Sequence, residues 1–340
     1  MTVKERVLGL LEAHRGVFVS GGQFASAAGV SRTAVWKAVS ALREDGYPIE
    51  AVTNKGYRLS AESSRLSLAG MAPYFDGSDY NLQNTQDTQD TQNIIIRRSI
   101  DSTNNEAKRM IADAPGAAPY GTVIIAGEQT AGRGRRGRAF VSPAADSVYM
   151  SFILKPAVKA GPPFLVTIMA AVCVCEAIEE VCGAQSPYAQ TPLIKWVNDV
   201  FLDGRKICGI LTEAVSDVES GGIESIVLGI GININVPEDA FPEDIREIAG
   251  SLRLDPGDRN RFAAALVRHV RAAYAKLSEG ISPIAAYRSR SLVTGHEITV
   301  LGANARKATA REILDNGSLL VEYADGSTEV LVSGEVSVRL

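Results

Sequence analysis

The sequence predicts an α+β protein of several domains, in which a small basic domain precedes a larger acidic one. Its 340 residues suffice for two or three domains of about 100–200 residues each. Residues 1–60 carry eight Lys and Arg against five Asp and Glu, a net charge of +3. Because the whole chain carries −4, the remaining residues carry −7. A basic head on an acidic body points to nucleic-acid binding at one end only.

Composition and cysteine placement exclude several classes of protein. A hydrophobic fraction of 46% is ordinary for a globular chain and excludes wholesale disorder. The longest apolar run, Phe164 to Cys175, is shorter than the roughly 20 residues of a membrane-spanning helix, so no membrane segment is expected. The charged N-terminus does not resemble a signal peptide, which favours a cytoplasmic protein. Without a Cys-x-x-Cys pair, the cysteines are expected to be core thiols rather than zinc ligands; they are Cys173, Cys175, Cys182 and Cys208.

The first sixty residues contain three short helical patterns followed by a hairpin pattern. A leucine-rich periodic segment predicts the first helix, and the stretch before Gly29 predicts the second. Ser31 is placed to cap a third helix, which Gly46 ends. The next residues alternate around the turn Asn54-Lys55-Gly56, as in a hairpin. This order of elements predicts a winged helix–turn–helix domain over residues 1–62.

The third helix of this domain leaves a polar face for DNA. Val35, Val39 and Leu42 recur on one face, so the opposite face is left to solvent. In this kind of domain the third helix enters the major groove and the wing reaches phosphates. The candidate DNA-binding residues are Ser31, Arg32, Thr33, Trp36, Lys37 and Ser40 on the helix, and Lys55 and Arg58 on the wing. A small helical accessory domain that binds protein, or nothing, stays open as the alternative.

Residues 63–93 are predicted to form a linker that contains a low-complexity insertion. Segment 81–93 repeats Thr-Gln-Asp and has almost no apolar side chain. Such a segment cannot bury enough surface to offset the entropy of ordering, so a mobile loop without an assigned role is expected. Three isoleucines at 94–96 then predict a buried strand and the start of a central domain over residues 94–290.

Three glycines and four arginines share one short segment after a strand predicted at 122–129. Gly132, Gly134 and Gly137 match the G-x-G-x-x-G pattern of dinucleotide-binding folds. That pattern must open a helix and precede an acidic residue by about 20 positions. Here loop residues follow, and Asp146 comes only nine positions after the last glycine. We therefore reject a Rossmann fold, and the sequence of a P-loop is absent as well.

The arginines of this segment favour an anionic ligand; they are Arg133, Arg135, Arg136 and Arg138. Glycine lets the backbone close on a ligand and expose its N–H groups, while arginine grips carboxylate or phosphate at two points. The segment therefore suits a polyanion, or an acid that is being joined to a phosphate. An RNA-binding RGG-like tract and a solvated basic turn are the alternatives, although an RGG tract would repeat within disordered sequence.

Two later segments add further candidate ligand-binding residues. Lys195 lies between the apolar Ile194 and Trp196, where a lone charge is costly, so it is expected to meet a bound anion. A later strand-like segment contains Gly229 and Gly231, which give a ligand room beside the backbone. A β-bulge is the alternative explanation of these two glycines.

Five motifs in one order resemble the bifunctional biotin–protein ligase and biotin operon repressor family, the BirA type. They are Asp-Ser-Thr-Asn at 101–104, GEQTAGRGRRGRAF at 127–140, KWVND at 195–199, KICGIL at 206–211 and GIGININ at 229–235. The resemblance covers nearly the whole chain, from the winged helix–turn–helix to a terminal SGEVSVRL that is similar to the end of the family's C-terminal domain. The Arg-Gly segment together with K-W-x-N-D is highly specific for this family.

The resemblance implies a fold for the rest of the chain. It implies a central mixed-sheet catalytic domain, related to class II aminoacyl-tRNA synthetases and typical of biotin ligases. It also implies a C-terminal SH3-like β-barrel over residues 291–340, where short strand patterns are split by glycine turns.

The resemblance further implies an ATP-dependent biotin–protein ligase. Biotin and ATP would give biotinyl-5′-AMP, and biotin would then pass to a lysine of the biotin carboxyl carrier domain of acetyl-CoA carboxylase or a related carboxylase. Mg²⁺ is expected with ATP, and Asp199 is the one candidate ligand. Operator DNA would be bound by a ligand-dependent homodimer, with biotinyl-5′-AMP as the co-repressor.

The resemblance also assigns roles to the matched residues. Lys195, Arg133 and Arg135 are expected to act in catalysis, with Lys195 neutralising the charge that the carboxylate and the α-phosphate share. The residues expected to bind biotin are Ser102, Thr103, Asn104, Gln129, Gly132, Arg133, Gly134, Arg135, Lys195, Gly229 and Gly231. The residues expected to contact the nucleotide are Arg135, Arg136, Arg138, Phe140, Asn198, Asn233 and Arg339.

The chain departs from the family's usual pattern at two places. Val197 stands where the family usually has proline, and Ala139-Phe140 where it usually has Lys-Trp, which keeps an aromatic ring and loses a cation. Three other functions stay open. They are a lipoate–protein ligase, which shares the fold but lacks this Arg-Gly loop; a transcription factor whose central domain binds a ligand without catalysis; and a ligase whose winged helix does not bind DNA.

Overall fold

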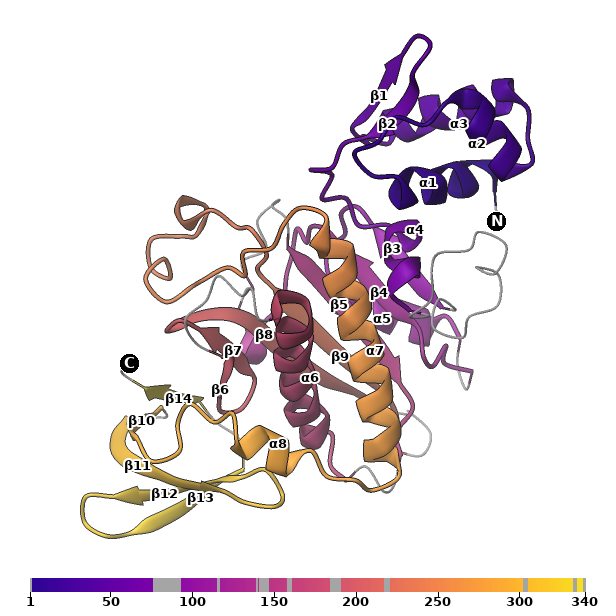
Figure 1. Cartoon of the computed structure of the whole chain (residues 1–340). Helices are drawn as coiled ribbons and strands as arrows, with labels where there is room; N and C mark the ends of the chain where they lie inside the picture. Colours follow the sequence, from indigo (N-terminus) through magenta and orange to yellow (C-terminus); the bar gives the residue numbers. More distant parts are fainter. Residues whose placement is uncertain are drawn as a thin grey trace. The chain divides into compact units, whose positions relative to one another are not determined.

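The computed structural model divides the chain into two units, Met1–Ile96 with Leu254–Ala265, and Arg97–Arg253 with Leu266–Leu340 (Figure 1). The structure describes residues 2–75, 93–114, 117–138, 140, 147–157, 161–183, 191–216, 221–301, 305–332 and 335–338. The predicted insertion therefore lies outside the described residues except for its last position, Asn93. The predicted domain boundaries at 62, 93 and 290 stay predictions.

The first unit begins with three helices and a hairpin, as predicted. They are α1 (Val3–Ala13), α2 (Gly21–Ala28), α3 (Arg32–Glu44), β1 (Ile49–Val52) and β2 (Gly56–Leu59). Each helix starts after a hydroxyl side chain, because the oxygens of Thr2, Ser20 and Ser31 accept hydrogen bonds from backbone N–H groups three residues on. The helix–turn–helix and the hairpin are confirmed.

The core of this part of the chain is formed by the apolar faces of the three helices and the hairpin. Val35, Val39 and Leu42 of α3 are buried in it, as the periodicity predicts. The hairpin lies against the segment before α2 through a two-hydrogen-bond bridge between Val19 and Tyr57. A Cβ at Gly56 would overlap with the backbone there, so this turn requires glycine.

The linker is anchored inside the first unit by the beginning of α7 (Asp258–Ser278). It contains α4 (Leu68–Met71) and a 3-10 turn, Ala72–Tyr74. Asn260 accepts a hydrogen bond from the Ser67 backbone (3.0 Å) and donates one to the carbonyl of Arg65 (2.9 Å). Arg259 donates to the carbonyl of Ser64 at 2.9 Å. The linker therefore has a specific structure up to residue 75, which its composition does not predict.

The second unit is built on a central sheet whose strands run in the order β4-β5-β9-β8-β7-β6. Its pairings are antiparallel, while the bridge between Ile100 and Gln129 is parallel, so the sheet is mixed, as expected. The strands are β4 (Val123–Ala126), β5 (Val148–Leu154), β6 (Leu193–Lys195), β7 (Asp199–Leu202), β8 (Arg205–Ser216) and β9 (Ile223–Ile232). A further strand of the sheet, β3 (Ile94–Arg97), spans the boundary between the units.

Helices cover the two faces of the central sheet. On one face, α5 (Thr103–Ala112) packs its Ala107 and Ile111 against Ile124, Ile153 and Val227 of three strands. Side chains alternate along a strand, so residues of odd number in β5, β8 and β9 share this α5 face. On the other face lies α6 (Phe164–Cys182), whose Thr167 hydroxyl is 2.7 Å from that of Thr212 (Figure 1).

Three of the four cysteines are core thiols, as predicted, and the fourth, Cys182, lies at the end of α6. Cys173, Cys175 and Cys208 are buried, and Cys182 is half-buried. Burial raises the pKa of the Cys173 and Cys208 thiols, and that of Cys175 to about 12. The helix α6 has 19 residues and is mostly apolar. Neither it nor any other helix of the described residues is long and apolar enough to cross a bilayer.

The C-terminal part of the second unit is a single antiparallel sheet that follows α8 (Ile284–Arg288). Its five strands have the order β13-β12-β11-β10-β14. Within the described residues β13 pairs with β12 alone and β14 with β10 alone, so the expected closed barrel is not formed. The strands are β10 (Glu297–Leu301), β11 (Arg306–Ile313), β12 (Leu319–Tyr323), β13 (Thr328–Leu331) and β14 (Glu335–Val338).

Candidate functional site

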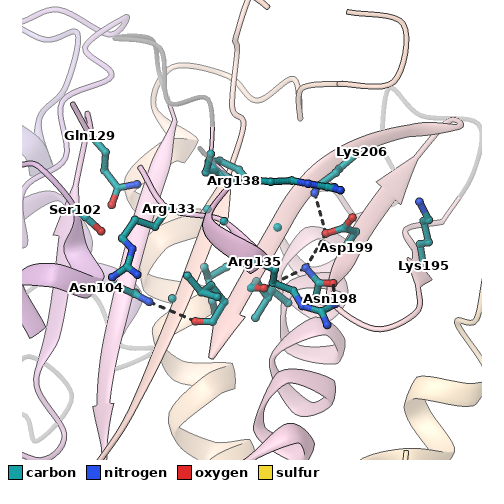
Figure 2. Close-up of a pocket in the computed structure, with 18 of the residues that line it drawn as sticks. Ser102, Asn104, Gln129, Arg133, Arg135, Arg138, Lys195, Asn198, Asp199 and Lys206 are labelled. Atoms are coloured by element: carbon teal, nitrogen blue, oxygen red, sulfur yellow. Dashed lines mark hydrogen bonds and ion pairs between the residues drawn. The ribbon is translucent and has the colours of Figure 1, made fainter. Parts of the chain in front are cut away.

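A pocket of about 250 Å³ lies on the α5 face of the central sheet (Figure 2). Most of the predicted ligand-binding residues line it together, although they come from segments far apart in the sequence. These are Ser102, Thr103, Asn104, Gln129, Arg133, Gly134, Arg135, Arg138, Phe140, Lys195, Asn198, Gly229 and Gly231.

Four predicted residues are not placed in this lining. Gly132 is absent from it, although its carbonyl accepts a hydrogen bond from the Phe140 backbone at 3.0 Å. Asn233 is buried outside the lining, where its amide donates to the carbonyl of Gly250 at 3.0 Å. The side chain of Arg136 and the whole of Arg339 lie outside the described residues.

Several lining residues were missed by the sequence reasoning. They are Trp196, Lys206, Gly209, Ile210, Leu211, Ile230, Leu301, Val336 and Ser337, and Asp199 was considered only as a metal ligand. The signal for Gly209 and Leu211 was present, since strand alternation places both on the face that carries Gly229 and Gly231. Leu301, Val336 and Ser337 come from the C-terminal sheet, and no local sequence signal places that sheet beside the pocket.

Glycines form the floor of the pocket. A Cβ at Gly229 would overlap with the side chain of Asn104, and one at Gly231 would lie 2.9 Å from the Phe140 ring. Gly209 is equally close to this ring, at 2.8 Å. Gly229 and Gly231 pair in regular register with Ser151 and Tyr149, so the alternative of a β-bulge is wrong. The glycines instead let side chains of α5 and of the Arg-Gly loop approach the sheet.

One end of the pocket presents amide and hydroxyl groups in fixed orientations. The backbone N–H and the hydroxyl of Thr103 both donate to Gln129 Oε1, at 2.7 and 3.1 Å. The hydroxyl of Ser151 donates to Asn104 Oδ1 at 2.6 Å. The carbonyl oxygen of Gln129 accepts the two hydrogen bonds from Thr103. Its amide nitrogen can therefore donate to a ligand in the pocket that Gln129 lines (Figure 2).

Glu213 of β8 holds several of the side chains at this end of the pocket in place. Its carboxylate accepts hydrogen bonds from Lys108 Nζ (2.6 Å) and Asn104 Nδ2 (2.9 Å), and lies 3.5 Å from Arg133 Nη2. Burial alone would raise the pKa of this carboxyl, but the hydrogen bonds from Lys108 and Asn104 and the charge of Arg133 lower it below its usual value. Glu213 therefore stays ionised and fixes both a pocket amide and the first arginine of the loop.

The Arg-Gly loop folds back on itself above the glycine floor. The backbone N–H of Gly134 donates to the carbonyl of Arg138 at 2.8 Å, around a 3-10 turn at Arg135–Gly137. Arg135 Nη1 donates to Asn198 Oδ1 at 2.8 Å, and Asn198 Nδ2 donates to Asp199 at 2.9 Å. The loop is thus linked by side chains to the KWVND segment, which the sequence alone could not show.

Positive charge dominates the pocket. Lys195 and Gln129 lie at opposite ends, and Arg135 and Arg138 lie between them (Figure 2). The Lys195 ammonium lies 5.7 Å from the centre of the Phe201 ring, a cation–π contact. Among the described lining residues the charged ones are Arg133, Arg135, Arg138, Lys195 and Lys206 against a single carboxylate, Asp199. This arrangement favours an elongated ligand with more than one negative charge.

The described residues contain no group of three or more His, Cys, Asp and Glu side chains that could hold a metal ion. In the pocket, the Asp199 carboxylate already accepts a hydrogen bond from the Asn198 amide and forms an ion pair with Lys206, whose Nζ lies 2.8 Å away. A divalent cation here would therefore need ligands from the substrate itself.

The first unit presents a second candidate surface on α3. Arg32, Thr33, Trp36 and Lys37 are exposed, and 59% of the Trp36 surface is accessible although tryptophan is normally buried. The recognition face predicted from the helical periodicity is therefore open to solvent.

The two cations predicted on the wing differ in their surroundings. Lys55 is exposed in the turn and lies 5.9 Å from the centre of the Phe18 ring. Arg58 pairs with Glu50 at 2.7 Å and stacks on the same ring at 4.5 Å. A phosphate contact by Arg58 would have to replace the ion pair with Glu50.

Comparison with protein families gives two matches in this chain. Residues 97–233 match the biotin/lipoate A/B protein ligase family, and residues 3–58 match a helix–turn–helix domain family. The first match contains most of the pocket, and the second contains α3 and the hairpin.

Full-length relatives and solved structures agree with these matches. The chain is 33% identical to the bifunctional ligase/repressor BirA of Bacillus subtilis, over 97% of each chain, and 30% identical to that of Escherichia coli, over 99% of this chain and 98% of the relative. Its fold matches that of the Aquifex aeolicus biotin protein ligase in complex with biotin and ATP, with a TM-score of 0.59 and 27% identity over 73% of this chain and 99% of that structure.

Proposed function

This chain belongs to the family of bifunctional biotin–protein ligases and repressors, and we propose that its pocket joins biotin to AMP before biotin passes to a carrier lysine. The observation that carries the proposal is the basic Arg-Gly loop closed over a glycine floor, with Lys195 at the far end of the same pocket. An acid and a nucleotide are both anions, and this pocket supplies cations along its length.

In the first step a carboxylate oxygen of biotin attacks the α-phosphorus of ATP. The new P–O bond forms as the bond to the β-phosphate oxygen breaks, which gives biotinyl-5′-AMP and pyrophosphate. Lys195 and Arg135 would neutralise the negative charge that concentrates between carboxylate and phosphate in the transition state. Gln129, Thr103 and Asn104 would hold the uncharged ring of biotin at the other end.

In the second step the ε-amine of one carrier lysine attacks the acyl carbon of the adenylate. The amide bond forms as the acyl–phosphate bond breaks, AMP leaves, and the proton of the amine passes to solvent. We expect Arg133 and Arg135 to keep the loop over the adenylate until the carrier arrives, because a mixed anhydride exposed to solvent would hydrolyse.

Mg²⁺ is proposed to enter with the phosphates of ATP rather than on a preformed protein site. Asp199 fits a supporting role at most, since it is the one carboxylate in the described lining and already faces Lys206 and Asn198. When bound, the ion would screen the phosphate charges, and no step above depends on it.

The second activity of the family is repression, and the exposed face of α3 supports DNA binding here. We propose that biotinyl-5′-AMP, once made, favours a homodimer that places two such helices at the spacing of an operator. The carrier is proposed to be the biotin domain of acetyl-CoA carboxylase or a related carboxylase. Buried free thiols are consistent with the reducing cytoplasm as the location.

The C-terminal sheet is proposed to complete the site, because Leu301, Val336 and Ser337 line the pocket. An SH3-like arrangement remains our proposal for it. A lipoate ligase is disfavoured, since the matched Aquifex aeolicus structure is a biotin protein ligase in complex with biotin and ATP, and the Arg-Gly loop is present.

The test is to incubate the purified chain with biotin, ATP and Mg²⁺, and to look for biotinyl-5′-AMP by mass. We expect the adenylate to accumulate on the protein with biotin and not with lipoate. Biotin binding without adenylate would make the central domain a sensor and repression the main function.

A further inference from the structure

The strand that carries Lys195 is paired on its far side with the connection to the C-terminal sheet. The Ile194 N–H donates to the carbonyl of Arg290 at 2.7 Å, and the Leu292 N–H donates to the carbonyl of Ile194 at 2.8 Å. This parallel bridge between Ile194 and Ser291 covers β6, the last strand of the central sheet. The residue directly before Lys195 is therefore fixed by residues almost a hundred positions later.

The residue directly after Lys195 is fixed by a turn of the C-terminal sheet. Trp196 is only 3% exposed, and its indole N–H donates to the carbonyl of Gly317 at 3.0 Å. Gly317 has a φ of +85°, and a Cβ there would overlap with Ile168 of α6. The turn between β11 and β12 is thus wedged against α6, and Phe164 of that helix meets the Trp196 ring edge-on at 6.4 Å.

The next residue is fixed by α8. Tyr287 has no exposed surface, and its hydroxyl donates to the carbonyl of Val197 at 3.1 Å. Burial raises the pKa of this hydroxyl well above its usual value, so it remains a neutral donor at any pH the protein meets. A buried tyrosine whose hydroxyl donates a hydrogen bond to a loop carbonyl restrains the position of that loop.

These contacts leave little freedom for the lysine between them. We propose that Tyr287, together with Trp196, is a positioning residue that holds Lys195 at the reacting end of the pocket. Neither side chain needs to touch the reacting atoms, because both act through the backbone on the C-terminal side of Lys195. The inference rests on the proposed role of Lys195 in adenylate formation.

The experiment uses Tyr287→Phe, which keeps the ring and removes the hydroxyl. Tyr120→Phe is the matched control, because its hydroxyl also donates to a backbone carbonyl, that of Glu224, at 2.9 Å. The readout is the single-turnover rate of biotinyl-5′-AMP formation per titrated active site. We expect Tyr287→Phe to lower this rate about tenfold, the equivalent of one buried hydrogen bond, and Tyr120→Phe to leave it unchanged.

A double-mutant cycle separates positioning from plain stability. In a Lys195→Ala background, Tyr287→Phe is expected to cause no further loss, since the group that it positions is gone. An equal loss in both backgrounds, or a lower number of active sites at an unchanged rate per site, would overturn the proposal. Trp196→Phe runs through the same cycle with the same expectation if Tyr287→Phe does not fold. Absence of adenylate in the unaltered chain would instead refute the proposed function.

Discussion

At the scale of single residues, the site depends on a carboxylate that no motif contains. Glu213 joins Lys108, Asn104 and Arg133, which are at least 80 positions distant in sequence. The arginines, the lysine and the small polar residues were predictable, because glycine-rich basic loops and a lysine among apolar neighbours are local patterns. Glu213 and Tyr287 were not, since their partners become visible only when distant strands and helices meet.

Glu213→Gln is expected to change how stability depends on pH. The pKa of Glu213 is lowered in the folded protein, so its ionised form stabilises the fold above the unfolded value of about 4.3, and this contribution is lost as the pH falls through the folded pKa. The variant should lose about 1 kcal/mol at pH 7, after allowance for the partial exposure of the pair, and less at pH 3.5.

Urea unfolding at the two pH values measures this difference. Glu322→Gln is the control, because Glu322 forms an exposed ion pair with Arg311 away from the pocket, and its stability should match that of the unaltered chain. An equal loss for Glu213→Gln at both pH values would argue against an ionic role for Glu213.

At the scale of elements, β9 contributes to the floor of the pocket and the Arg-Gly loop lies above it. The start of α3 was predictable from its capping residue Ser31, which acts locally. The strand expected at 122–129 is shorter, Val123–Ala126, although Gln129 beyond its end still forms a parallel bridge with Ile100. The closed barrel that the resemblance implies for the C-terminal strands is not formed by the described residues, and local strand patterns could not reveal this because closure depends on pairing between the ends of the sheet.

Gly229→Ala is expected to weaken biotin binding at least tenfold. The new methyl group would overlap with Asn104 and push it away from Ser151 and Glu213. Calorimetric titration with biotin gives the measurement. Gly257→Ala is the control, since a Cβ there would make only an ordinary contact, 3.6 Å from Arg15. Unchanged biotin affinity in Gly229→Ala would show that Asn104 does not need its present position.

Arg135→Ala is expected to release adenylate into solution. Its hydrogen bond to Asn198 ties the loop to the turn between β6 and β7, and without it the loop should no longer shield the anhydride. Biotin label on lysines of an unrelated protein added to the assay is the readout. Arg306→Ala, on the C-terminal sheet over the Tyr323 ring, is the control and should label none. Full retention of adenylate by Arg135→Ala would contradict the lid role.

At the scale of the whole molecule, the helix–turn–helix match and the ligase match cover separate parts of the chain, residues 3–58 and 97–233. Charge asymmetry and element order in the first sixty residues were enough to predict the winged helix, because its helices and hairpin form from consecutive residues. Residues 254–265 also belong to the first unit, and no change in amino-acid composition along the chain predicts this. The reason is physical, since Asn260 and Arg259 bind linker backbone about 190 positions earlier.

A chain without residues 1–60 is therefore expected to keep ligation and lose DNA binding. This cut preserves Ser64 to Ser67, which hydrogen-bond Arg259 and Asn260. Adenylate formation and a gel shift on DNA upstream of biotin genes are the two measurements. Loss of adenylate formation in the folded truncated chain would contradict a modular organisation.

Exchange of labelled pyrophosphate into ATP tests most directly whether the pocket activates biotin before any carrier arrives. We expect exchange that requires biotin, needs no carrier protein and falls about a hundredfold or more in Lys195→Ala. A chain that binds biotin but shows no biotin-dependent exchange, or a Lys195→Ala variant that exchanges at the full rate, would contradict this expectation.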